Sequence, residues 1–197
     1  ELVRAGTLYH DIGKMHDPLG FIENQMGCKN KHDELNDPYA STKIIKKHVS
    51  EGLVMARRCG LPKAIQDFIP EHQGTLLISY FYFQAQKEGK GTVAEADFRY
   101  DGPTPQSRET GIVMLADGCE AALRSLSDVS SEKALSMVNK IIRSRWQDEQ
   151  LKDANLTPNE LKKIAQVFVR VWQQTNHKRI AYPKAALDAK YASSLKK

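Results

Sequence analysis

Apolar residues recur at intervals of three and four along almost the whole chain, and this spacing constrains the fold more than any other feature. It begins with Leu2, Ala5 and Leu8 and predicts a first helix over residues 2–14. No pair of strands joined by a hairpin turn is evident, so the sequence predicts an all-α fold in a single domain. Further helices are expected at residues 37–59, 62–69, 75–86, 111–123 and 131–146, and from residue 157 onward.

Turn and capping residues mark the boundaries of these helices. Asp37-Pro38 supplies an N-cap and a proline for the first turn, and Gly60 ends the same helix. Thr157-Pro158-Asn159-Glu160 is a capping box. Residues 21–36 and 89–106 are expected to be loops. The domain is expected to span residues 1–180, followed by a polar, basic C-terminal tail at residues 181–197.

Charge and hydropathy narrow the classes of function. The chain of 197 residues carries a net charge of +5, with a pI of about 9.0. Its basic residues are spread along the sequence without interleaved aromatics, so binding to polymeric nucleic acid is disfavoured. A small anionic substrate explains the charge as well. No apolar run approaches the roughly 18 residues that a membrane-spanning helix needs, so none is expected here.

The cysteines argue against a thiolate zinc site. Cys28, Cys59 and Cys119 are widely spaced and form no CxxC pair. Unpaired cysteines are typical of a reducing compartment.

Three His-Asp pairs stand out, and their surroundings differ. His10-Asp11 follows an apolar helical run, whereas His16-Asp17 precedes Pro18 and His32-Asp33 lies in a polar stretch. Burying an unpartnered polar group costs roughly 2–7 kcal/mol. A metal ion would remove that cost at the first pair, while the other two pairs are expected to be solvated.

Three more polar residues occupy apolar settings. His48 shares the apolar face of its helix, His72 ends a short helix, and Asp117 lies within an apolar helix. Each alone also fits a structural role, as a core histidine or as a salt-bridged acid. Together with His10-Asp11 they offer imidazole and carboxylate ligands from separate helices, which suits iron, manganese, zinc or cobalt better than calcium. A carboxylate such as Asp11 can bridge two ions about 3.5–4 Å apart, a common arrangement for cleaving phosphate esters.

The segment His10-Asp11-Ile12-Gly13-Lys14 resembles the HDIGK signature of the HD-domain phosphohydrolases. An ordered set of further segments is similar to one branch of that family, the membrane-anchored phosphodiesterases with a seven-helix transmembrane region that hydrolyse cyclic di-AMP. The similarity extends over roughly residues 1–180, and its segments are Phe21-Ile22-Glu23-Asn24-Gln25, His32-Asp33-Glu34-Leu35, Ile44-Ile45-Lys46-Lys47-His48-Val49, Glu71-His72-Gln73-Gly74-Thr75, Phe98-Arg99-Tyr100, Gly102-Pro103, Pro105-Gln106, Ala116-Asp117 and Glu120-Ala121-Ala122.

The resemblance implies an HD-type helical bundle and two divalent ions, iron or manganese. It implies that Asp11 bridges the ions, that His10 and Asp117 bind one of them, and that His48 and His72 bind the other. The family has one more ligand histidine upstream of the HD pair, at a position before Glu1. The chain is therefore expected to be an N-terminally truncated fragment in which one ion binds more weakly. It is also expected to be the cytoplasmic domain of a membrane-anchored protein.

The implied activity is hydrolysis of one phosphodiester bond of cyclic di-AMP to give linear pApA, by attack of a water or hydroxide between the two ions. Asp11 and Lys14 would be catalytic. Lys14 is expected one helical turn beyond His10, where it could hold a phosphate oxygen or be a solvated surface lysine. Arg99 and Tyr100 are candidate substrate-binding residues, for a phosphate and an adenine ring respectively.

Residues expected to surround the ligands are Asn24, Gln25 and Gln73. Many family members carry a second histidine at the position of Gln73. Gln73 can still form hydrogen bonds but is a poor metal ligand.

Other functions remain open on the sequence alone. One is hydrolysis of another nucleotide by the same chemistry, and a second is nucleotide sensing without catalysis. A third is binding of nucleic acid by a basic helical protein, which would weaken steeply with salt. The sequence gives no indication of the oligomeric state.

Overall fold

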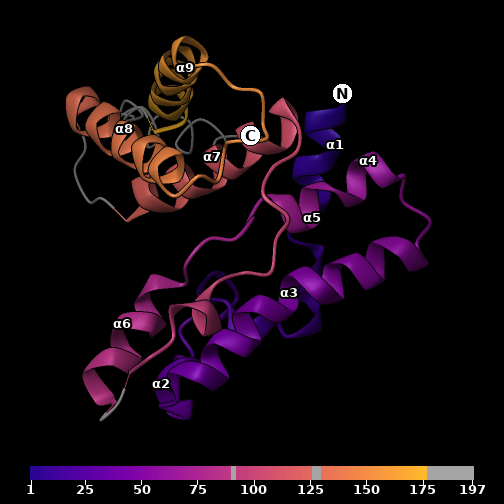
Figure 1. Cartoon of the computed structure of the whole chain (residues 1–197), viewed down its shortest axis with the longest axis vertical. Helices are drawn as coiled ribbons and strands as arrows, with labels where there is room; N and C mark the ends of the chain where they lie inside the picture. Colours follow the sequence, from indigo (N-terminus) through magenta and orange to yellow (C-terminus); the bar gives the residue numbers. More distant parts are fainter. Residues whose placement is uncertain (90–91, 126–129, 177–197) are drawn as a thin grey trace, which may run out of the picture.

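The computed structural model describes residues 1–89, 92–125 and 130–176, and this part of the chain is all-α, as predicted (Figure 1). The predicted tail lies outside the described residues. The α-helices are α1 Leu2–Tyr9, α2 Lys31–Leu35, α3 Pro38–Arg58, α4 Lys63–Gln66, α5 Phe68–Glu71, α6 Ser79–Glu88, α7 Arg108–Arg124, α8 Ser131–Gln147 and α9 Pro158–Asn176. Short 3-10 helices are η1 Ile12–His16, η2 Pro18–Gly20, η3 Ile22–Asn24 and η4 Glu95–Phe98.

The predicted capping residues act as expected. The side chain of Asp37 accepts hydrogen bonds from the backbone N–H groups of Tyr39 and Ala40 at the start of α3. At the start of α9, the backbone N–H of Thr157 donates to the Glu160 carboxylate at 2.8 Å, and the Glu160 N–H donates back to the Thr157 hydroxyl at 3.3 Å. These local signals fix where two of the longest helices begin.

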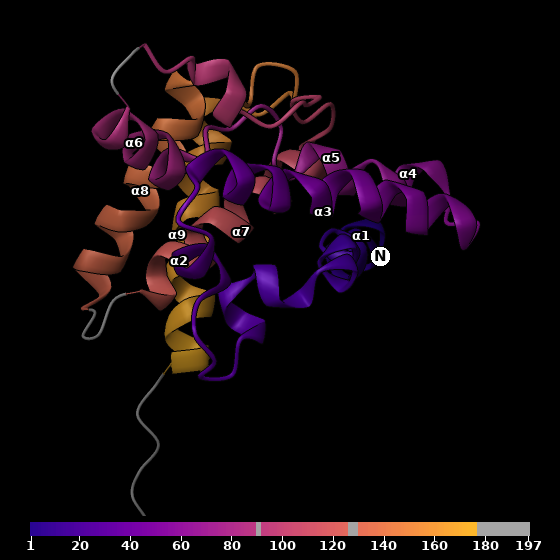
Figure 2. The same ribbon diagram turned by 90° about the horizontal axis from the view of Figure 1, so that it is seen from below.

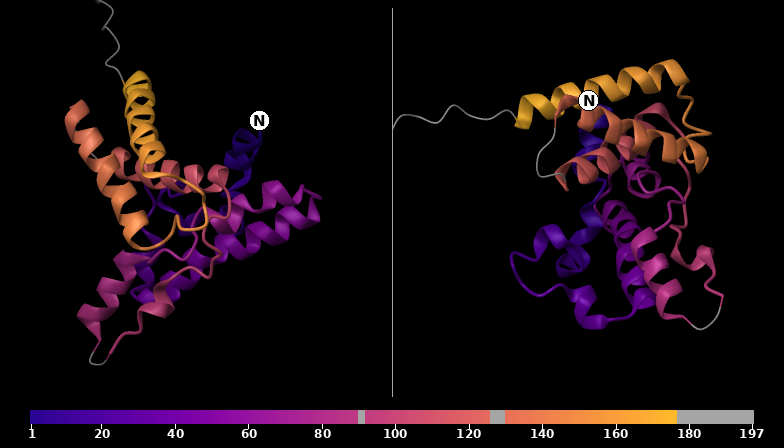
Figure 3. Two further views of the ribbon diagram at one scale, coloured as in Figure 1. Left: turned by 45° about the horizontal axis from the view of Figure 1, so that its top comes forward. Right: turned by 90° about the vertical axis from the view of Figure 1, so that its left-hand side faces the viewer.

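Helices α7, α8 and α9 form one part of the molecule, in which α8 and α9 lie side by side and contact α7 (Figure 3). They enclose an apolar cluster that includes Met114, Leu115, Val138, Leu151 and Leu161. The amphipathic patterns of these three helices account for the cluster, since each contributes one apolar face.

The long helix α3 organises the other part, where η1, α5 and α6 contact it. Helix α1 contacts α4, α5 and α7, and so joins the two parts (Figure 2). Gly6 permits this close packing, since a Cβ atom there would lie 2.4 Å from the ring of Phe68. The arrangement brings the end of α1, the middle of α3, the end of α5 and the middle of α7 toward one region.

The predicted helix over residues 2–14 is wrong beyond Tyr9. The chain turns at His10 and Asp11 and continues as the separate helix η1, which packs along α3. Apolar residues continue at helical spacing through this turn, although Gly13 packs against α3 rather than extending the face of α1.

Other boundaries also differ from the prediction: residues 62–69 are divided between α4 and α5, and η4 lies within the expected loop 89–106. The region 21–36 is not all loop: it contains η3 and α2, and His32 in α2 is half-buried, with its Nε2 2.9 Å from the Gly20 carbonyl oxygen. Helix α6 begins at Ser79 rather than at residue 75. The preceding residues pair with a distant segment through Tyr100 N–H to Leu76 O at 3.0 Å and Ile78 N–H to Phe98 O at 2.8 Å.

Across the described residues, no helix combines the length and the hydropathy that crossing a membrane requires.

Candidate metal centre

The signature pair lies in the turn between α1 and η1. His10 immediately follows α1, and Asp11 has φ −108° and ψ 14°, outside the helical range. Two residues on, Gly13 lies against α3 so closely that a Cβ atom would be 1.7 Å from the carbonyl oxygen of His48. This contact places Asp11 opposite His48.

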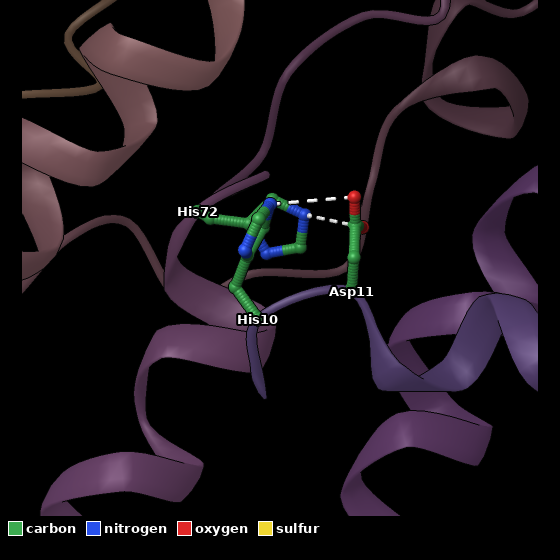
Figure 4. A group of neighbouring side chains, drawn as sticks. All are labelled: His10, Asp11 and His72. Atoms are coloured by element: carbon green, nitrogen blue, oxygen red, sulfur yellow. Dashed lines mark ion pairs between the residues drawn. The ribbon is translucent and has the colours of Figure 1, made fainter. Parts of the chain in front are cut away.

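Four of the predicted ligands converge on Asp11 or on its neighbour His10. Asp11 Oδ1 lies 3.4 Å from His72 Nε2 and 3.5 Å from His48 Nε2. Asp11 Oδ2 lies 3.3 Å from His10 Nε2, which is in turn 3.8 Å from Asp117 Oδ1. Figure 4 shows His10 and His72 directed toward Asp11. The structure therefore brings together all five residues that the sequence nominated as ligands, from the C-terminal ends of α1 and α5 and from α3 and α7.

The three imidazoles share one orientation. Each Nδ1 lies within hydrogen-bond distance of a backbone carbonyl oxygen one turn earlier: 2.7 Å from Thr7 O for His10, 2.5 Å from Ile45 O for His48 and 2.7 Å from Ile69 O for His72. A carbonyl oxygen only accepts, so Nδ1 must carry the proton. In the neutral ring each Nε2 then presents a lone pair to the centre, which is the orientation of metal-binding histidines.

The groups at the centre shift the pKa values of one another, and Asp11 supplies the negative charge. Burial opposes ionisation of Asp11, but the imidazoles of His10 and His72, 3.3 and 3.4 Å from its oxygens, outweigh burial and hold the pKa of Asp11 far below its usual range. Burial likewise disfavours the charged form of His10, yet the nearby carboxylates of Asp11 and Asp117 raise its pKa to about 10, so a cation bound at Nε2 would take the place of a proton. Burial and the charge of His72 lower the pKa of His48 to about 4. Asp11 therefore stays ionised and attracts cations.

Two atoms at the centre fit a bound cation. His10 Nε2 and Asp11 Oδ1 are buried, and neither has a hydrogen-bond partner among the described residues. Buried polar atoms are rarely left in that state. Ligand atoms of His10, Asp11 and His72 all lie within 4.8 Å of one another, a spacing that one ion can satisfy. The donor set of nitrogen and carboxylate oxygen matches a transition-metal ion.

Lys14 also reaches the centre, although by a different route from the predicted helical turn. From η1, its Nζ lies 2.7 Å from Asp11 Oδ2 and 2.6 Å from Glu23 Oε1, and 5.2 Å from the ring centre of Phe21. Burial alone would lower the pKa of Lys14, but the charge of Asp11 and the bonds to both acids raise it. The lysine is a fixed cation at the edge of the centre.

Glu23 and Phe21 have no predicted role, yet both border the centre. Glu23 pairs with Lys14, and the ring of Phe21 packs edge-on against His48 with centroids 5.5 Å apart. The sequence did contain a signal for these two residues, because the segment Phe21-Ile22-Glu23-Asn24-Gln25 carries part of the family resemblance.

Tyr100 lies close to the centre and is partly buried. Its ring packs edge-on against His48, with centroids 6.0 Å apart. Burial, with the charges of Asp11 and Asp117, raises its pKa well above the usual range, so the hydroxyl stays protonated. Its contact with His48 supports a role in orienting that imidazole.

Arg99 makes its hydrogen bonds elsewhere. The guanidinium binds both carboxylate oxygens of Asp148 at 2.9 and 3.1 Å, Glu95 at 2.7 Å and the carbonyl oxygen of Thr75 at 2.8 Å. These contacts tie the segment after His72 to the end of α8. A role of Arg99 in nucleotide binding stays a prediction.

We expect Arg99→Ala to lower the free energy of unfolding by roughly 1–3 kcal/mol, because it removes a bidentate ion pair and a bond to a backbone carbonyl. If these contacts are the only role of Arg99, the KM for substrate should not change. Urea unfolding and steady-state kinetics measure the two effects. Arg124→Ala is the control, since its exposed pair with Glu120 within α7 contributes little. A raised KM with unchanged stability would instead support the substrate-binding role.

The remaining predicted residues lie around the centre or beside it. Gln25 is buried, and its amide donates to Leu19 O at 3.0 Å and Asn30 Oδ1 at 3.3 Å, so it holds the η2–η3 segment together. Asn24 is exposed, and Gln73 is half-buried directly after His72. Their contribution to metal binding stays a prediction.

Comparison with known proteins defines the class. The HD domain family matches residues 1–122, which include all five converging residues, and the chain belongs to this family. An uncharacterized protein of Synechocystis is 69% identical over 197 residues, covering 98% of this chain and 24% of that protein. The cyclic-di-AMP phosphodiesterase PgpH of Bacillus subtilis is 40% identical over 189 residues, covering 96% of this chain and 26% of PgpH.

A solved structure agrees with the sequence relatives. The HD domain of the Listeria monocytogenes phosphodiesterase PgpH, in complex with cyclic-di-AMP, matches with a TM-score of 0.85 and 39% identity, covering 92% of this chain and 83% of that chain. The chain spans about a quarter of the length of the curated relatives it matches.

Proposed function

We propose that this domain is a metal-dependent phosphodiesterase that hydrolyses cyclic di-AMP to linear pApA. The observation that carries the proposal is the convergence of three imidazole Nε2 atoms on the two oxygens of Asp11. The relatives named cyclic-di-AMP phosphodiesterase support the substrate, as does the related HD domain in complex with that dinucleotide.

We propose that His10, Asp11, His48, His72 and Asp117 hold two divalent ions, iron or manganese. The geometry supports two sites, because Asp11 Oδ2 faces His10 while Oδ1 faces His48 and His72. When bound, such ions lower the pKa of water and neutralise charge on a phosphoryl group.

The residues of the chain supply position and charge. Asp11 stays ionised and orients toward all three imidazoles, while the backbone carbonyls hold each ring in the ligating tautomer. Lys14 would exchange its bond with Glu23 for a phosphate oxygen of the substrate, which adds a fixed positive charge where negative charge develops. Asp117, with 36% of its side chain exposed, opens the centre to solvent.

Product analysis tests this proposal. After treatment with a chelator and reconstitution with Mn²⁺ or Fe²⁺, the protein is incubated separately with cyclic di-AMP, cyclic di-GMP and ATP, and products are resolved by chromatography. We expect conversion of cyclic di-AMP to pApA, loss of turnover in chelator and recovery with metal. Consumption of ATP alone would overturn the substrate, and binding of cyclic di-AMP without turnover by metal-loaded protein would indicate a sensor.

The chain covers about a quarter of its curated relatives, so what a longer protein adds is also a proposal. Membrane anchoring of such a protein, with this domain on the cytoplasmic side, follows from the family resemblance alone.

A further inference from the structure

A buried carboxylate next to a ligand histidine is not explained by the metal centre itself. Glu71, the last residue of α5, is only 5% exposed. Its Oε2 accepts a hydrogen bond from the Thr110 hydroxyl at 2.6 Å and another from the Gln106 backbone N–H at 2.8 Å. A buried charge persists only where such bonds replace its hydration.

The two partners of Glu71 belong to the start of α7. Thr110 lies in its first turn, where Ser107 is the N-cap and the two side chains form a capping box. The positive end of the helix dipole and the two donors therefore both favour a carboxylate at this place. The same bonds fasten α5 to α7.

Both fastened elements carry a proposed ligand. Glu71 directly precedes His72, whose Nε2 faces Asp11. Thr110 is seven residues before Asp117, so the two lie two turns apart on the same face of α7, roughly 10 Å along its axis. Glu71 thus connects His72 on one side of the centre with Asp117 on the other, through one side-chain bond and a rigid helix.

We propose that Glu71 is a positioning residue that sets the spacing between His72 and Asp117, and thereby controls metal affinity and turnover. This role rests on the proposed function, although the effect on metal affinity does not depend on the identity of the substrate. A carboxylate that served only the stability of the fold would leave metal affinity unchanged once the protein is folded.

Variants of Thr110 and Glu71 distinguish a positioning role from a purely stabilising one. Thr110→Val keeps the shape and removes the donor, Thr110→Ser keeps the donor, and Glu71→Gln keeps the size and removes the charge. Ser107→Ala is the matched control, because it removes the cap of the same helix and the Ser107–Thr110 hydroxyl contact, while the Thr110 hydroxyl keeps Glu71 as its acceptor. Mn²⁺ affinity is measured by calorimetric titration of the chelator-treated protein. The kcat and KM are measured in steady-state assays with cyclic di-AMP.

We expect Thr110→Val and Glu71→Gln to weaken Mn²⁺ binding about tenfold or more and to lower kcat more than they raise KM, as for other residues that orient metal ligands. Thr110→Ser should restore both, and Ser107→Ala should lower only the unfolding temperature. If Thr110→Val and Glu71→Gln lose stability but bind Mn²⁺ as Ser107→Ala does, the positioning role is contradicted. If the unaltered protein binds Mn²⁺ without hydrolysing cyclic di-AMP, the proposed function fails and the Mn²⁺ comparison still decides the role of Glu71.

Discussion

Asp11→Asn is expected to abolish metal-dependent hydrolysis, with turnover lowered about a thousandfold or more, while the chain stays folded. The substitution keeps the size of the side chain and removes its charge. Asp11 is the residue whose two oxygens reach His10, His48 and His72 as well as Lys14. Its loss leaves the imidazoles without the anion that attracts cations to the centre.

The second His-Asp pair provides the control for this variant. Asp17 lies six residues further along, and its carboxylate pairs with Lys31 at 2.5 Å rather than with the cluster. Asp17→Asn should therefore bind metal and turn over substrate like the unaltered protein. Steady-state assays and elemental analysis of both variants make the comparison. Retention of metal and turnover by Asp11→Asn, or equal losses in both variants, would contradict the assignment of the first pair.

Gly13→Ala is expected to destabilise the fold by roughly 3 kcal/mol or more, which lowers the unfolding temperature by several degrees. The new Cβ would lie 1.7 Å from His48 O and 2.6 Å from Gly52 N, and both are backbone atoms of α3 that cannot rotate away. Helix η1 must therefore move off α3, which also separates Asp11 from His48. Metal affinity should fall together with stability.

Gly118→Ala is the matched control, because a Cβ there would lie 3.4 Å from the nearest side-chain atoms, an ordinary contact. Gly118 is inside α7, where alanine is favoured over glycine by about 1 kcal/mol, so stability should stay the same or rise slightly. Urea and thermal unfolding of both variants test this expectation. A Gly13→Ala protein as stable as the Gly118→Ala protein would show that η1 and α3 are not packed as described.

Local sequence signals predicted much of the fold. Caps at Asp37 and Thr157 placed the starts of α3 and α9, because a cap depends on residues only two or three positions away. The turn at His10 and Asp11 escaped prediction, since it depends on how Gly13 meets α3. The start of α6 was likewise set by pairing with a segment twenty or more residues away.

The candidate metal centre was likewise predictable where local sequence signals sufficed, and not where contacts join distant segments. Residue type and apolar setting nominated His10, Asp11, His48, His72 and Asp117, and the structure brings these five together. Contacts that join distant segments could not be read from the sequence. Arg99 binds Asp148, 49 residues further on, and Glu71 binds Thr110, 39 residues further on. Such pairings depend on how helices pack, and no local spacing encodes them.

Anomalous scattering from crystals grown with Mn²⁺ would test directly whether cations hold this cluster together. Peaks are expected between Asp11 and the Nε2 atoms of His48 and His72, and between Asp11, His10 and Asp117, and they should be absent from crystals of Asp11→Asn. Mn²⁺ bound only at surface carboxylates such as Glu34 or Glu88, with no peak beside Asp11, would contradict the account.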